Sequence, residues 1–136
     1  MSGYLKYTWI PVIIAAIIFY LCCLIPPNDI PDVGFEFFIP TDKLVHFVMY
    51  FGLSAATGLY YVYDRKGHIN ILKMVIGAIL IPILYGGFIE IVQWKFFPPR
   101  SGDWYDFLAD ALGSIAALPV ILYARRYYLR KETYLI

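Results

Sequence analysis

The stretch LVHFVMYFGLSAATGLYYVY, residues 44–63, decides the fold class because it runs for 20 residues without a lysine, arginine, aspartate or glutamate. A helix of about 20 mostly apolar residues is what crosses the hydrocarbon core of a bilayer. Three more segments of the 136-residue chain are mostly apolar: 7–25 has no charged residue, 70–94 carries only Lys73 and Glu90, and 107–123 carries only Asp110. In lipid every backbone polar group needs a partner within the protein, which favours helices over open strands. The sequence therefore predicts an all-α fold, an integral membrane four-helix bundle.

The composition disfavours other classes of protein. Hydrophobic residues make up 61% of the chain and charged residues 15%, whereas soluble domains carry about 25% charged residues. An ordinary soluble domain, a disordered chain and a basic nucleic-acid binder are therefore disfavoured. The expected partners are membrane lipids, with no nucleic acid. Cys22 and Cys23 are adjacent in an apolar run, so they form neither a disulfide framework nor a spaced metal pair.

The charged residues predict an orientation. The helices are expected at about 7–25, 43–63, 70–94 and 105–125, followed by a basic tail at 124–136 that suits an anionic membrane surface. Basic residues flank the chain ends and the middle loop: Lys6, Arg65, Lys66, Lys73, Arg125, Arg126, Arg130 and Lys131. Basic flanks stay in the cytoplasm. We therefore expect both termini to be cytoplasmic and residues 1–136 to form one domain.

Polar side chains gather at the opposite ends of three of the predicted helices. Spacings of three, four and seven residues place those of each helix on one face. The set is Asp42, Lys43, His46 and Tyr50 on the second helix, Glu90 and Gln93 on the third, and Arg100, Asp103, Asp106 and Asp110 in and after the loop before the fourth. The first helix carries nothing comparable and is interpreted as a scaffold.

Acidic side chains within a membrane-spanning segment are energetically costly. A carboxylate in the hydrocarbon region costs about 2.5–3.5 kcal/mol on insertion scales and usually faces the bundle interior. Glu90, Asp110 and His46 are therefore expected to face one another, and Asp110 to be protonated or to share a proton near neutral pH. Small residues such as Gly113 allow helices to approach closely. Pro82 is expected to kink the third helix.

The polar residues form an ordered pattern. It runs Asp42-Lys43-x-x-His46-Phe47-x-x-Tyr50, Glu90-x-x-Gln93 and Arg100-x-x-Asp103-x-x-Asp106-x-x-Ala109-Asp110-x-x-Gly113. This pattern resembles the VanZ-like membrane protein family, named after an accessory protein of glycopeptide-resistance clusters linked with reduced teicoplanin sensitivity. The resemblance implies a multi-pass protein of the bacterial cytoplasmic (inner) membrane, with a polar site facing the cell envelope at the outer leaflet. The family usually has Asn where this chain has Asp110.

Several functions remain open for this polar site. The residues can hold the helix ends together through ion pairs. They can bind an envelope lipid or lipid-linked precursor, with its phosphate on Lys43 and Arg100. They can form a metal-assisted lipid-phosphate hydrolase or transferase, with His46 between Asp42 and Glu90 as general base. Asp106 and Glu90 would then surround Mg²⁺ or Mn²⁺. The chain can also be a non-catalytic subunit of a larger membrane complex.

The charge balance bears on these alternatives. Five acids surround the site against three bases when Lys95 is counted, and this excess repels an anion unless a proton or metal intervenes. A single histidine without a nearby cysteine disfavours zinc. Catalytic residues and cofactors are therefore left unassigned, and no metal ligand is predicted.

Overall fold

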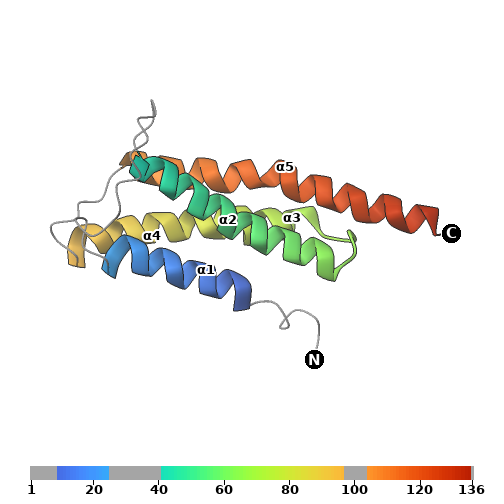
Figure 1. Cartoon of the computed structure of the whole chain (residues 1–136), viewed down its shortest axis with the longest axis horizontal. Coiled ribbons are helices and arrows are strands. Elements are labelled where there is room, and N and C mark those ends of the chain that lie inside the picture. Colours follow the sequence, from blue (N-terminus) through green and yellow to red (C-terminus); the bar gives the residue numbers. More distant parts are fainter. Residues whose placement is uncertain (1–8, 25–40, 97–103, 136) are drawn as a thin grey trace.

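The computed structural model describes residues 9–24, 41–96 and 104–135, which form four helices (Figure 1). Helix α1 (Trp9–Phe19) continues as the π-helix η2 (Tyr20–Leu24). Helix α2 spans Thr41–Asp64 and helix α5 spans Trp104–Tyr134. The fourth helix is made of α3 (Ile71–Val75), the π-helix η4 (Ile76–Leu80) and α4 (Ile81–Phe96). The predicted all-α four-helix bundle is confirmed, and part of the expected basic tail continues α5 as helix.

The helices have the surface of a membrane protein. Lys43–Asp64, Ile71–Phe96 and Trp104–Tyr134 are long and apolar enough to cross a bilayer, whereas the apolar helix Trp9–Cys23 is shorter. Large apolar side chains are exposed on all four helices, among them Val12, Ile17, Val48, Leu72, Leu84, Phe88, Leu112 and Ile115. A soluble monomer rarely exposes contiguous apolar patches of this kind. These side chains are the surface that lipid covers.

Helices α2 and α5 pack side by side along the bundle (Figure 1). A Cβ atom added at Gly113 would meet the backbone carbonyl of Phe47, and one added at Gly58 would meet the side chain of Ile121. Helix α4 also approaches α5 closely, because a Cβ atom at Gly86 of α4 would lie 2.9 Å from Oδ2 of Asp110. Glycine at these positions therefore permits the close approach that the small residues predict.

A π turn sets which face of the third long helix is buried. Met74 and Glu90 are both buried, although residues 16 positions apart on a regular α-helix point about 160° apart. The single π turn of η4 accommodates one extra residue and reduces this angle to about 60°. Pro82, expected to kink the helix, lies just after this turn. The π turn is thus what brings Glu90 to the face that meets α2 and α5.

A tight turn after α2 closes the end of the bundle where α2 ends and α3 begins. Lys66 and Gly67 have φ angles of 51° and 87°, and the Gly67 amide donates to the Val62 carbonyl at 2.9 Å. A Cβ atom at Gly67 would lie 3.0 Å from the carbonyl oxygen of Arg125. Left-handed residues of this kind commonly end helices. The turn packs against α5 and gathers basic residues at this end of the bundle.

Candidate functional site

Five polar side chains converge at the other end of the bundle, where α2 and α5 begin and α4 approaches its end. We call them the polar cluster: Lys43, His46, Glu90, Asp106 and Asp110. His46, Glu90, Asp106 and Asp110 are buried, and Asp110 is 0% exposed. The spacing of three to four residues along each helix keeps these groups on the faces that meet.

The contacts of the cluster alternate between α2 and α5. Lys43 Nζ lies 3.1 Å from Asp106 Oδ1, and His46 Nε2 lies 3.8 Å from Asp106 Oδ2. His46 Nδ1 is hydrogen-bonded to Asp110 Oδ1 at 2.8 Å. The two carboxylates are one helical turn apart, as are the lysine and the histidine. Asp106 therefore lies between Lys43 and His46, and Asp110 is the deeper partner of the histidine.

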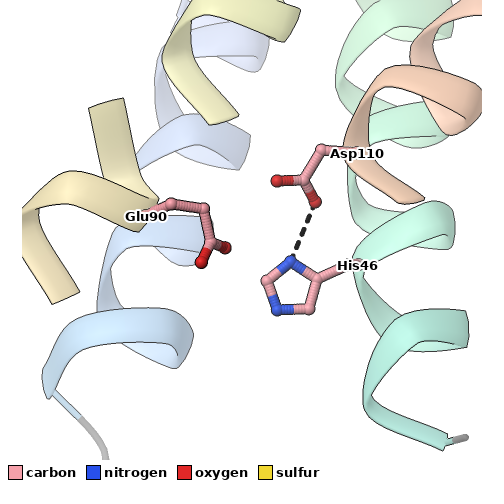
Figure 2. A group of neighbouring side chains, drawn as sticks. All are labelled: His46, Glu90 and Asp110. Carbon is pink, nitrogen blue, oxygen red and sulfur yellow. Dashed lines mark hydrogen bonds and ion pairs between the residues drawn. The ribbon is translucent and has the colours of Figure 1, made fainter. Parts of the chain in front are cut away.

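Glu90 approaches the histidine from α4. Figure 2 shows its carboxylate and that of Asp110 pointing toward the imidazole of His46 from different helices. One potential ligand atom from each of His46, Glu90 and Asp110 can be chosen so that all lie within 4.8 Å of one another. The expectation that these three groups face one another is confirmed. What they bind stays a prediction.

Three more polar side chains lie one or two helical turns deeper. Tyr50 and Ser54 follow His46 at four-residue intervals on α2, and Ser114 follows Asp110 on α5. All three side chains are 0% exposed, and their hydroxyl groups have no hydrogen-bond partner among the described residues. The sequence analysis named Tyr50 but missed both serines. Continuing the four-residue spacing past Tyr50 and Asp110 would have found them.

Gln93 is placed differently from the expectation that it belongs with the cluster. Its Nε2 donates to the backbone carbonyl of Cys22 at 2.6 Å. The Tyr85 hydroxyl likewise donates to the Ala15 carbonyl at 2.7 Å. The last carbonyls of a helix lack partners within that helix, so Gln93 satisfies one of those of η2. Two side chains of α4 therefore donate hydrogen bonds to the backbone of the first helix.

Three of the predicted site residues are not placed by the structure. Arg100 and Asp103 lie outside the described residues. Asp42 belongs to α2, but its side chain is also outside the description. The predicted position of His46 between Asp42 and Glu90 is therefore described on the Glu90 side alone, and Asp106 and Asp110 are its contacts on α5.

One comparison with known proteins identifies the family of this chain. The VanZ/LLP1 family model matches residues 6–125. The chain belongs to the VanZ/LLP1 family. Neither the search of curated proteins nor that of solved structures found a match to this VanZ/LLP1 protein. The family and the three long apolar helices make it a VanZ-like membrane protein.

The polar cluster of this VanZ/LLP1 protein is rich in negative charge. Three carboxylates face one lysine ammonium and one imidazole. Carboxylates in a membrane interior need a compensating charge or proton. The buried part of the cluster is therefore suited to a cation, whereas Lys43, whose side chain is 21% exposed, offers a positive group at its edge.

Proposed function

We propose that this VanZ/LLP1 protein is a multi-pass protein of the bacterial cytoplasmic membrane that binds the phosphate headgroup of an envelope lipid or lipid-linked precursor at the outer leaflet. The proposal has two parts, the orientation of the bundle and the chemistry of the polar cluster. Each part has its own support and its own experiment.

The spacing of charged groups along the helices supports the orientation. On α2, His46 and Asp64 are about 27 Å apart along the axis, and on α5, Asp106 and Arg125 are about 28 Å apart. A hydrocarbon core is about 30 Å thick. The polar cluster and the basic end therefore fit opposite boundaries of one bilayer. Because basic ends stay in the cytoplasm, the cluster belongs at the outer leaflet.

A hollow on α5 supports the same orientation. It is lined by Tyr123, Arg126, Tyr127, Arg130, Lys131 and Tyr134. Basic residues interleaved with aromatic ones suit the anionic lipids of the cytoplasmic leaflet. The basic extension of α5 thus continues the spanning helix beyond the inner boundary of the membrane in this proposal.

The observation that carries the binding function is the placement of Lys43. Its ammonium group lies 3.1 Å from Asp106 at the exposed edge of an otherwise buried cluster. An ammonium at a membrane boundary is a point charge for phosphate oxygens. Asp106 fixes the lysine on the α5 side, so the headgroup approaches from the membrane boundary.

A metal-assisted lipid-phosphate hydrolase or transferase is the second candidate. The proximity of His46, Glu90 and Asp110 favours it, because a histidine with two carboxylates can hold a catalytic metal ion. Retention of an unaltered lipid by the purified protein supports the binding function. Release of phosphate from that lipid would support the enzyme.

The binding test compares two lysines near the same end of the bundle. Native mass spectrometry of protein extracted with its own lipids should show a retained phosphate-bearing lipid. Lys43→Gln should lose that lipid, whereas the control Lys95→Gln, at an exposed position in the last turn of α4, should keep it. Equal retention by both variants would refute the role of Lys43.

The orientation test uses single cysteines introduced at positions 32, 101 and 66. An impermeant thiol reagent added outside should label the first two and not the third. Cys22 and Cys23 are buried, so the parent protein serves as the unlabelled control. Labelling of all three positions from one side would refute the proposed topology.

A further inference from the structure

The three groups at the centre of the polar cluster come from three helices and meet at one point (Figure 2). We infer that His46, Glu90 and Asp110 bind a divalent first-row transition-metal ion such as Mn²⁺ or Zn²⁺. This inference goes beyond the proposed lipid binding, because it concerns the buried centre of the cluster and can be measured without any lipid ligand.

The geometry suits a metal ion. The potential ligand atoms all lie within 4.8 Å of one another, and tetrahedral ligands at about 2.0–2.2 Å from one ion are separated by about 3.3–3.6 Å. Small side-chain rotations bring the more distant atoms together, while His46 Nδ1 and Asp110 Oδ1, which are 2.8 Å apart, move slightly apart. The hydrogen bond of 2.8 Å between His46 Nδ1 and Asp110 Oδ1 marks the line along which the ion replaces a proton.

The charge and burial of the cluster favour a cation. Glu90, Asp106 and Asp110 are buried, while Lys43 supplies the positive charge seen among the described groups of the cluster. With a neutral imidazole these groups carry an excess of two negative charges. A divalent ion neutralises that excess inside the protein, where uncompensated carboxylates are most costly.

Two buried oxygen atoms point independently to a missing ligand. Asp110 is 0% exposed, and its Oδ2 has no hydrogen-bond partner among the described residues. The same holds for the hydroxyl of Tyr50, which lies one helical turn after His46 on α2. Buried polar atoms normally have a partner. An ion at the cluster gives the Asp110 carboxylate one, and water on that ion gives Tyr50 one.

The surroundings of His46 are those of a metal ligand. A histidine that binds a metal through one ring nitrogen usually directs the other toward a carboxylate. His46 Nε2 faces Asp106 Oδ2 at 3.8 Å, and Asp106 is itself fixed by Lys43. Asp106 and Lys43 thus act as positioning residues that orient the imidazole.

The donor set selects the class of metal. Mg²⁺ and Ca²⁺ take oxygen ligands, whereas an imidazole nitrogen favours first-row transition metals. Three protein ligands leave at least one coordination position for water or a phosphate oxygen. The sequence alone disfavours zinc because only one histidine is near the site, but the two convergent carboxylates complete a set of three protein ligands. The site is therefore expected to prefer Mn²⁺ or Zn²⁺ over Mg²⁺.

The experiment titrates metal into the full chain, purified in detergent and stripped with a chelator. Elemental analysis should find about one Mn²⁺ or Zn²⁺ per chain, with a higher Tm than the stripped protein, and Mg²⁺ should compete poorly. Asp110→Asn keeps the size of the side chain and its hydrogen-bonding oxygen, so the stripped variant should fold while its metal affinity falls at least tenfold. Asp106→Asn should weaken binding about 10- to 100-fold.

The second histidine provides the matched control. His68 is exposed and pairs with Glu132, so His68→Gln should bind metal as the parent does. Loss of binding in His68→Gln with retention in His46→Gln would overturn the assignment. Absence of any bound ion at millimolar Mn²⁺ or Zn²⁺ would also overturn it, whatever the outcome of the lipid experiment.

A measurement on the unaltered protein guards against variants that fail to fold. Pulsed electron paramagnetic resonance of the Mn²⁺-loaded chain should show coupling to one imidazole nitrogen. Coupling that persists in His68→Gln supports His46 as the ligand. A spectrum with no nitrogen coupling would place the ion elsewhere and refute the site.

Discussion

Two histidine–carboxylate pairs hold the two ends of the bundle and differ chiefly in burial. His46 and Asp110 are 2.8 Å apart, and His68 and Glu132 are 2.6 Å apart. Each pair joins a residue of α2 or the turn after it to α5 across 64 positions. The side chains of the first pair are 9% and 0% exposed, and those of the second are 63% and 55% exposed.

The comparison shows that a short distance does not measure the importance of an ion pair. Removing one partner of a buried pair typically costs about 3–5 kcal/mol, because the other polar group is left buried. An exposed pair contributes about 0–1 kcal/mol, because water and salt compete for both groups. The two ends should therefore respond very differently to the same substitution.

The largest effect is expected from Asp110→Ala. This change removes the partner of His46 and leaves a polar imidazole in a buried site, so the free energy of unfolding should fall by about 3–5 kcal/mol. Glu132→Ala, which removes the carboxylate of the exposed pair, should cost about 0–1 kcal/mol. Unfolding in mixed detergent micelles measures both, and equal losses would contradict the contrast between the two ends.

A smaller effect is expected when the helices that carry the buried pair are pushed apart. Gly113→Ala places a methyl group against the Phe47 backbone and should cost about 1–3 kcal/mol. Gly52→Ala meets open space on α2 and should stabilise the helix by about 0.5–1 kcal/mol. The sign of the change in unfolding free energy separates the two, and a stabilising Gly113→Ala would show that the close approach is not needed.

Loss of the link to the first helix should have a still smaller effect. Gln93→Leu removes a buried hydrogen bond to the Cys22 carbonyl, which should cost about 1–2 kcal/mol. Gln93 lies outside the polar cluster, so lipid retention by this variant should match the parent. If Gln93→Leu abolishes lipid retention, α1 shapes the binding site more than its contacts indicate.

The smallest effect is expected from His68→Gln. The exposed pair is screened by salt, so the change in unfolding free energy should stay within about 1 kcal/mol and shrink further at high ionic strength. The measurement is the same unfolding experiment at low and high salt. A large loss that persists in high salt would show that the exposed end is as critical as the buried one.

The sequence predicted the features that depend on regular helical spacing. Long stretches with few or no charged residues located the four helices, and the spacing of His46, Asp106 and Asp110 predicted which faces meet. Their convergence followed from the cost of placing carboxylates in lipid, with no knowledge of the packing. This reasoning works because a helix repeats every 3.6 residues and its polar groups cannot face the hydrocarbon.

The sequence did not predict the features that depend on departures from that spacing. The π turn at Ile76–Leu80 consists of apolar residues and carries no distinctive signal, yet it decides that Glu90 faces inward. The hydrogen bond from Gln93 to Cys22 ends on a backbone carbonyl near the end of the first helix, and no side-chain pattern reveals such a contact. The serines 54 and 114 were overlooked because a small hydroxyl in an apolar run looks like a packing residue.

The distance between the polar cluster and the basic end also matches the bundle to a membrane of a particular thickness. Helices α2 and α5 each separate their polar groups by about 27–28 Å. In the proposed orientation, charges that resist entering hydrocarbon anchor both helices at the two boundaries. A thicker bilayer must thin around this protein, at a cost of fractions of a kcal/mol per Å of mismatch. Lipids with shorter chains should therefore be enriched beside the bundle, so its position within a heterogeneous membrane follows from the length of its helices.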